Sequence, residues 1–321
     1  MMYFRKYWIP VVLLALSQPS LFAGDCSFQR TLQVNGPVNL EVVTGSGNIE
    51  VSPGNANQVQ VCGHIRTSEW FGGNVDEKVK RIKDNPPIQQ SGNDLRIGHI
   101  DDLELRHNIS IGFDLIVPPA TTLHSHSGSG NQEVRDIRGP VEVGAGSGSL
   151  NLSDIGGAVR AETGSGGIAV AHVKGNVRAH AGSGSIKADD VAGGFEASTG
   201  SGHIVLGQTA PGSVRVNTGS GGMELRGVHG SLEAEAGSGS IQAEGYPTGA
   251  WSIHTGSGSV RLQLASEAGF DLDARSRSGS VELNRPDSVQ GAVTRKQVQG
   301  KVRGGGVSVN VETGSGSIEI R

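Results

Sequence analysis

Short runs of alternating hydrophobic and polar residues recur along most of the chain. In one such run the apolar side chains of Leu150 and Leu152 are separated by Asn151, and similar runs return about every 18 residues. A period of two places every second side chain on the same face of an extended strand, so each run predicts a β-strand with one buried face. Between these runs the apolar residues show no helical spacing.

Two sets of strands supply the predicted interior. The first set has its apolar column at Leu150, Ile168, Ile186, Ile204, Met223, Ile241, Val260, Val281 and Ile318. The second set follows a turn glycine and has columns at Val141, Val159, Val177, Phe195, Val214 and Leu232, and at Val143, Ala161, Ala179, Ala197, Val216 and Ala234. Each period therefore predicts two short strands joined by two tight corners.

The tripeptide Gly-Ser-Gly marks one corner of each period. Its central serines are Ser46, Ser129, Ser147, Ser165, Ser183, Ser201, Ser220, Ser238 and Ser257, followed by the degenerate Ser278 and by Ser315. From Ser129 to Ser257 the spacing is 18 or 19 residues, and a fixed period of this size is typical of a solenoid. The last step, from Ser278 to Ser315, is 37 residues and indicates a turn that has lost its marker.

The spacing predicts an all-β fold, a single-stranded parallel β-helix with turns of about 18 residues. Equivalent residues would stack about 4.8 Å apart. Glycine would allow positive φ at the corner, and the stacked serines would form a ladder of hydroxyl groups. A phosphate-binding loop is excluded because such a loop occurs once, before a helix. The Gly-rich nonapeptide of calcium-binding β-rolls is absent.

The N-terminal part differs from these repeats. Residues 1–23 combine Arg5 and Lys6 with an apolar run, which is typical of a secretory signal peptide and is too short to span a bilayer. Between the first two markers, the sequence "NVDEKVKRIKDNPP" predicts one short amphipathic helix. We therefore divide the chain into a signal peptide (1–23), an N-terminal cap with irregular first turns (24–120) and a regular solenoid (121–321) that continues the cap.

The charge and hydropathy of the chain argue against nucleic acid as a partner and against a membrane span. The formal net charge is -4, and loss of the two basic residues of the signal peptide makes it -6, which argues against nucleic acid as the main partner. No other segment is apolar and long enough to span a membrane. In an exported protein the two cysteines, Cys26 and Cys62, predict a disulfide, with two unpaired thiols as the alternative.

Candidate chemistry is sparse. The corner position seven residues after the serine carries Asp136, Asp154, His172 and Asp190, which would lie in a line about 4.8 Å apart. Such a column could hold a cation, and ordinary turn chemistry is the simpler interpretation. Two histidines of one strand, His124 and His126, have no identifiable third ligand. We expect no catalytic, cofactor-binding or metal-binding residue.

The outward positions of the second set of strands carry charges of both signs. They are Glu142, Arg160, Arg178, Glu196, Arg215 and Glu233. Stacked turns would place most of these residues opposite a partner of the other sign, and each exposed pair would contribute about 0.2–1 kcal/mol.

The order of these segments resembles the bacterial putative-adhesin family of unknown function. The segments are "EVVTGSGNIEV", a helix-bearing stretch and "DLIVPPATTLHSHSGSGNQEVRDIRGPVEVGAGSGSLNL". The resemblance extends from about Val34 to the end and implies a β-helix-like protein of the envelope or cell surface, without a catalytic motif.

We expect an exported, non-catalytic solenoid, located in the periplasm or at the cell surface, that serves as a scaffold or as an adhesin-like binder of a protein or glycan. The alternative is a carbohydrate-active β-helix enzyme, either a lyase or a hydrolase. Such an enzyme needs acidic residues that converge in one cleft.

Overall fold

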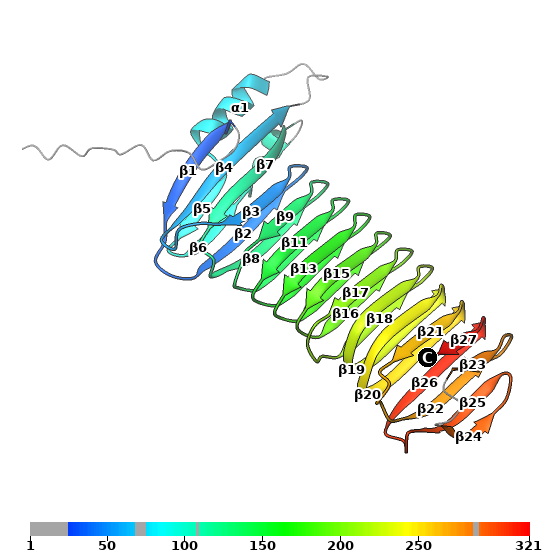
Figure 1. The fold of residues 1–321 in the computed structure, drawn as a ribbon. Helices are drawn as coiled ribbons and strands as arrows, with labels where there is room; N and C mark the ends of the chain where they lie inside the picture. Colours follow the sequence, from blue (N-terminus) through cyan, green and yellow to red (C-terminus); the bar gives the residue numbers. More distant parts are fainter. Residues whose placement is uncertain (1–24, 68–74, 107–108, 285–288) are drawn as a thin grey trace, which may run out of the picture.

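The protein winds as a long solenoid of stacked turns (Figure 1). The computed structural model describes residues 25–67, 75–106, 109–284 and 289–321, and the predicted signal peptide lies outside these ranges. Within them, 27 strands join into one continuous sheet, and each turn packs on the next. The all-β, solenoid-like architecture expected from the alternating pattern is confirmed.

One wall of the solenoid consists of the strands that precede each Gly-Ser-Gly corner, and we call it the pre-corner sheet. It contains β2 (Val38–Thr44), β8 (Thr121–Ser127), β10 (Val141–Ala145), β12 (Val159–Thr163), β14 (Val177–Ala181), β16 (Phe195–Thr199), β18 (Val214–Thr218), β22 (Phe270–Ser276) and β26 (Val307–Ser315). Neighbouring strands are parallel and in register, so Val159 lies opposite both Val141 and Val177.

The opposite wall consists of the strands that follow the corner, and we call it the post-corner sheet. It contains β3 (Ile49–Pro53), β9 (Gln132–Arg135), β11 (Leu150–Ile155), β13 (Ile168–Val173), β15 (Ile186–Val191), β17 (Ile204–Gln208), β21 (Val260–Leu264), β23 (Val281–Leu283) and β27 (Ile318–Ile320). Two longer strands, β19 (Met223–Ser238) and β20 (Ile241–Ser257), belong to both sheets, because β19 pairs with β17 through Met223 and with β18 through Leu232.

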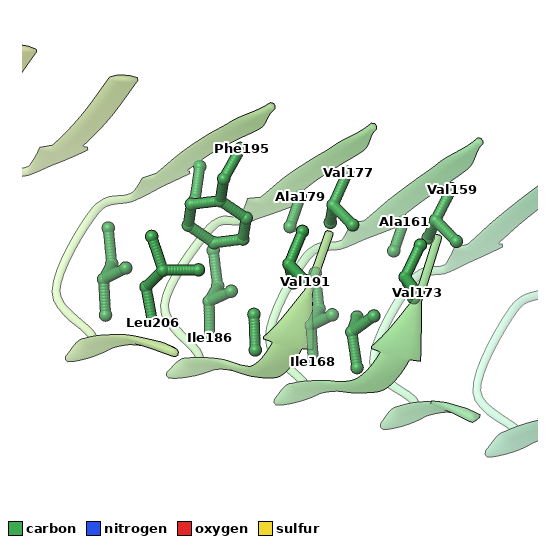
Figure 2. Close-up of a cluster of buried hydrophobic side chains, with 14 of the residues drawn as sticks. Val159, Ala161, Ile168, Val173, Val177, Ala179, Ile186, Val191, Phe195 and Leu206 are labelled. Carbon is green, nitrogen blue, oxygen red and sulfur yellow. The ribbon is translucent and has the colours of Figure 1, made fainter. Parts of the chain in front are cut away.

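The core is the narrow space between the two sheets. Figure 2 shows Val177 and Ala179 of the pre-corner sheet facing Ile168 and Ile186 of the post-corner sheet, and all four side chains are buried. Small side chains on one wall leave room for larger ones on the other, which explains why few aromatic residues are needed.

Each regular turn has a third inward position that the two-strand prediction missed. Strict alternation after Leu150 and Leu152 would turn Asp154 inward, but Asp154 has φ 58° and is exposed. This left-handed residue reverses the alternation, so Ile155 points inward and pairs with Val173 of the next turn. The third column therefore runs through Ile137, Ile155, Val173 and Val191, and all four are buried.

The corner glycines are required for a different reason from the one predicted. Only Gly316 among the Gly-Ser-Gly glycines of the described residues has a positive φ. A Cβ on Gly166 would instead lie 1.9 Å from the carbonyl oxygen of Gly148 in the preceding turn. Glycine therefore permits the close stacking of corners.

The corner serines recur at one place in each turn with exposed side chains, and no hydrogen bond joins the hydroxyls of neighbouring corner serines in the described residues. Backbone hydrogen bonds join the corners, for example from Ser165 N to the carbonyl of Gly146 at 3.2 Å. The hydroxyl inside this corner belongs to a threonine: Thr163 donates to the carbonyl of Gly148 at 2.9 Å and accepts from the amide of Gly166 at 3.2 Å.

At both ends the spatial order of turns departs from the chain order. Strand β26 lies between β20 and β22, and β27 lies between β21 and β23. The last Gly-Ser-Gly therefore inserts between the two preceding corners. The described residues of the 37-residue step form no turn without a marker. They include the antiparallel hairpin of β24 (Val289–Val293) and β25 (Gln297–Val302), and β25 also pairs with β22.

The N-terminal end has a cap of antiparallel strands. Its strands are β1 (Phe28–Gln33), β4 (Gln58–Thr67), β5 (Ile88–Ser91), β6 (Asp94–Ile97) and β7 (Ile109–Val117), and its helices are α1 (Val75–Asp84) and α2 (Leu103–Arg106). Strands β6 and β7 also pair in parallel with β2 and β3, which joins the cap to the two solenoid sheets. The prediction of one short helix is thus corrected, since α2 is a second one. After the cap the chain returns, and Ser129 N donates to the carbonyl of Gly45 at 3.1 Å, so the stack of corners is continuous.

Candidate functional site

A groove runs along the outer face of the pre-corner sheet. Its volume is about 880 Å³, and it crosses eight successive strands, from β8 to β20. One row of lining residues has short side chains: Thr122, Pro140, Ala158, Asn176, Gly194, Ser213, Ser231 and Ala250. The parallel row has longer polar side chains at every position but its last: His124, Glu142, Arg160, Arg178, Glu196, Arg215, Glu233 and Ser252. The short row forms a floor, beside which the long row stands as a wall.

The wall is held by ion pairs between neighbouring turns. His124 Nδ1 lies 3.3 Å from a Glu142 oxygen, Arg178 lies 2.7 Å from Glu196, and Arg215 lies 2.7 Å from Glu233. These side chains are about half exposed, so each pair is screened by solvent and contributes little to stability. Their effect is to hold the polar groups at fixed positions along the groove.

The alternation of charge breaks at the middle of the groove. Arg160 and Arg178 lie opposite each other in register. Arg160 turns to Glu142 at 3.6 Å and to Glu162 at 2.6 Å, whereas Arg178 pairs with Glu196 on the other side. Two arginines are therefore neighbours in this row, and each guanidinium group already pairs with glutamate. Guanidinium groups are well suited to carboxylates, phosphates and related planar anions.

The acidic column predicted from the sequence lies elsewhere. Asp136, Asp154, His172 and Asp190 are exposed and have φ between 53° and 58°. They stand where the post-corner strands bend, and His172 Nδ1 lies 3.5 Å from an Asp154 oxygen. Aspartate and histidine tolerate the left-handed conformation better than most residues, which accounts for their recurrence at this bend.

A second cluster lies in the N-terminal cap. The structure joins Cys26 to Cys62 by a disulfide, with the two Cα atoms 5.4 Å apart. His64 Nε2 lies 3.3 Å from the sulfur of Cys62 and 2.7 Å from an Asp114 oxygen. His64 and Asp114 also line a pocket of about 220 Å³. Sequence reasoning missed this cluster because antiparallel pairing of β4 with β7 brings Asp114 beside Cys62.

The sequence indicates only one of the two rows of residues that line the groove. The outward charges were recognised as pairs, but the row of short side chains beside them was not. Alanine, asparagine and glycine before each strand looked like turn residues, and only the stacking of strands shows that they form one continuous floor. Neither helix in the described ranges is long and apolar enough to cross a membrane.

Comparison with known protein families identifies the family of this chain. Residues 157–321, more than half of the sequence, match the Toastrack DUF4097 family. The chain belongs to this family. The resemblance noted from the repeated Gly-Ser-Gly strands is thereby confirmed.

Among solved structures, two proteins align with this Toastrack chain at 11% identity. A putative cell adhesion protein from Clostridium sporogenes aligns over 91% of this chain and 97% of its own, with a TM-score of 0.20. A putative adhesin from Bacteroides fragilis aligns over 92% of this chain and 96% of its own, with a TM-score of 0.30. Superpositions this loose support no inference about the site. No curated protein matches the chain.

The family match covers one candidate site more fully than the other. Within this Toastrack chain it includes most of the groove, from Ala158 to Ser252, together with the inserted strands at the C-terminal end. The cluster of Cys62, His64 and Asp114 lies outside the matched residues.

Proposed function

We propose that the protein is an exported, non-catalytic scaffold of the cell envelope whose groove on the pre-corner sheet binds an extended acidic glycan. The observation that carries the proposal is the unbroken length of the groove across eight strands. An extended polymer can use all of these turns at once, and many weak contacts in register then add up to a specific complex.

The chemistry of the lining supports a polar polymer. The wall offers guanidinium, imidazole and carboxylate groups, and the floor offers the hydroxyls of Thr122, Ser213 and Ser231 and the amide of Asn176. Together these groups donate and accept hydrogen bonds as sugar hydroxyls require. The neighbouring positions of Arg160 and Arg178 in the wall favour a ligand that carries an anionic group at the middle of the groove.

A non-catalytic role is supported by the electrostatics. The carboxylates of the wall are paired with basic residues and spread along the groove. Glycoside hydrolysis instead needs two acidic groups that flank one bond, one of them with a raised pKa. Glu319, on the post-corner sheet outside this groove, has a lowered pKa because Arg261 and Arg321 donate hydrogen bonds to it.

Export is proposed from the sequence of residues 1–23 together with the disulfide. A structural disulfide is typical of proteins that fold in oxidising compartments. The periplasm and the cell surface both meet this condition.

The decisive experiment fills the groove without touching the core. Ala158→Trp places a large side chain on the floor, and Ala169→Trp places the same side chain on the exposed face of the post-corner sheet. Both proteins and the wild type are applied to an array of acidic and neutral glycans. We expect binding of an acidic glycan by the wild type and by Ala169→Trp, and its loss in Ala158→Trp.

Two further measurements separate the alternatives. Arg160→Ala/Arg178→Ala should weaken binding of acidic glycans more than that of neutral ones. Binding that survives in Ala158→Trp would reject the groove as the site. Release of new reducing ends by the wild type, lost in Asp136→Asn/Asp154→Asn/Asp190→Asn, would reject the non-catalytic role in favour of a carbohydrate-active enzyme.

A further inference from the structure

The cluster in the N-terminal cap brings three different metal-ligating atoms together. The sulfur of Cys62, Nε2 of His64 and a carboxylate oxygen of Asp114 all lie within 4.8 Å of one another. Cys62 and His64 are two residues apart on β4, so their side chains leave the same face of the strand. Asp114 lies directly opposite Cys62 on β7. The pairing of two strands therefore fixes all three positions.

The distances are close to those of a zinc site. With Zn–N and Zn–O bonds of about 2.0–2.1 Å and Zn–S bonds of about 2.3 Å, a tetrahedral site has ligand–ligand distances of about 3.4 Å for N–O and about 3.6 Å for S–N. Here the His64–Asp114 distance is 2.7 Å and the Cys62–His64 distance is 3.3 Å. Small rotations of the side chains of His64 and Asp114 would admit the ion.

Burial divides the cluster into an inner and an outer part. Cys62 is fully buried, whereas the side chains of His64 and Asp114 are 29% and 35% exposed. The two outer residues line the pocket of about 220 Å³, through which an ion can enter. The disulfide keeps the sulfur of Cys62 from binding a metal, because only the thiolate is a good ligand.

We propose that reduction of the Cys26–Cys62 disulfide converts this cluster into a zinc site with Cys62, His64 and Asp114 as protein ligands and water in the fourth position. A dithiol reductant breaks the S–S bond, supplies two electrons and two protons, and becomes a disulfide itself, while Cys26 and Cys62 become thiols. When the metal binds, Cys62 loses its thiol proton to solvent, and His64 coordinates as the neutral imidazole through Nε2. The site is thus closed in the oxidised protein and open in the reduced one.

The test uses Co²⁺ as a spectroscopic probe for Zn²⁺. The purified protein is titrated with Co²⁺ before and after reduction by a dithiol, which is then removed under anaerobic conditions. We expect a sulfur-to-cobalt charge-transfer band, at one ion per chain, only in the reduced protein, and its loss when Zn²⁺ is added. Because both cysteines of the chain belong to the Cys26–Cys62 disulfide, the band reports on the thiols that its reduction releases.

Variants assign the ligands. Cys26→Ser leaves the thiol of Cys62 free and should bind Co²⁺ without any reductant. In the reduced protein, His64→Ala and Asp114→Asn should each weaken binding by more than the roughly 10–100-fold that loss of an outer partner of a ligand costs. His180→Ala, which removes an exposed histidine of β14 that does not line the groove, is the matched control and should bind as the wild type does.

Three results would overturn the proposal. They are the absence of a charge-transfer band in both the reduced protein and Cys26→Ser, unchanged affinity in both His64→Ala and Asp114→Asn, and loss of the folded cap on reduction. Circular dichroism of the reduced protein, recorded on the titrated sample, shows whether the cap stays folded. Glycan binding by the groove does not enter this test, so the two proposals fail independently.

Discussion

The middle turns and the two ends of this solenoid are stabilised in different ways. From β10 to β18 each strand lies parallel to a near copy of itself, 18 or 19 residues away, and the same column positions recur. At the ends the strands pair antiparallel, as β1 does with β4 and β22 with β25, and the chain order is broken by insertion. The N-terminal end adds a disulfide and two helices.

The comparison shows what repetition can and cannot provide. A middle turn is stabilised by pairing with similar turns above and below it. Small residues and glycine are therefore sufficient there to hold the turn in the stack, as long as no side chain obstructs the close approach of the turns. A terminal turn would expose the edge of the sheet, where other chains could pair. Antiparallel strands that fold back across each end cover this edge, and they require specific contacts that no repeat supplies.

The largest effect is expected from a corner of the middle turns. In Gly166→Ala the new Cβ would lie 1.9 Å from a backbone oxygen that cannot move without separating two turns. We expect a loss of more than about 4 kcal/mol in the free energy of unfolding, measured by denaturant titration. In the adjacent Gly167→Ala the Cβ meets only the oxygen of Ser185 at 3.6 Å, so this control should stay close to the wild type. Equal effects at the two positions would show that close stacking is not what requires glycine.

The second-largest loss of stability is expected from removal of the disulfide at the N-terminal end. Cys26→Ala/Cys62→Ala removes a cross-link between residues 36 positions apart, which corresponds to about 4 kcal/mol by chain entropy. Because a solenoid turn contacts only its neighbours, the loss should be confined to the cap. Amide hydrogen exchange should therefore accelerate in β1 and β4 and remain unchanged in β14. Acceleration of similar size in β14 would show that the cap and the middle turns unfold as one unit.

Within the middle turns, the size of side chains across the core sets the third effect. Ile186→Ala should cost about 2–5 kcal/mol through lost burial and a cavity, and Ala179→Leu should cost about 1–3 kcal/mol through overpacking. His180→Leu, on the exposed side of the same strand as Ala179, is the control and should cost little. Denaturant midpoints of the three proteins give the order. If His180→Leu were as damaging as Ala179→Leu, the inward face of β14 would be misassigned.

The middle turns were predictable because their signals are local. Alternation identified the buried faces of β12 and β14, and the spacing of Gly-Ser-Gly gave the register between them. The third inward column was missed because the left-handed bend at Asp154 interrupts the alternation, and a period of two carries no sign of such a bend. The corner glycines were recognised, but the reason for them depends on how closely neighbouring turns approach.

The ends were much less predictable, because their contacts join residues far apart in the chain. The Gly-Ser-Gly around Ser315 looks like any other, so its sequence does not show that β26 inserts between β20 and β22. The groove depends on the same stacking as the middle turns. Its charged wall was predicted from the outward charges, whereas its floor of short side chains was not. The cluster at Cys62 depends on the antiparallel pairing of β4 with β7, and the marker repeat says nothing about that pairing.

The smallest effect concerns the inserted strand β27 at the C-terminal end. Glu319 accepts a hydrogen bond from Arg261 of β21 at 3.0 Å and another from Arg321 at 2.6 Å, and these two bonds lower its pKa below the ordinary value of 4.5. A lowered pKa in the folded state means that the stabilisation is present above the unfolded pKa and is lost as the pH falls through the folded pKa.

Arg261→Ala should raise the pKa of Glu319 toward 4.5, as followed by NMR titration of its carboxyl carbon. Arg226→Ala removes an exposed arginine of the same sheet that pairs with Glu224, and as the matched control it should leave Glu319 unchanged. The free energy of unfolding should change little in either variant, because both arginines are exposed and solvent screens their ion pairs. A pKa of Glu319 that did not respond to Arg261→Ala would mean that the inserted strand is not held to β21 through this contact.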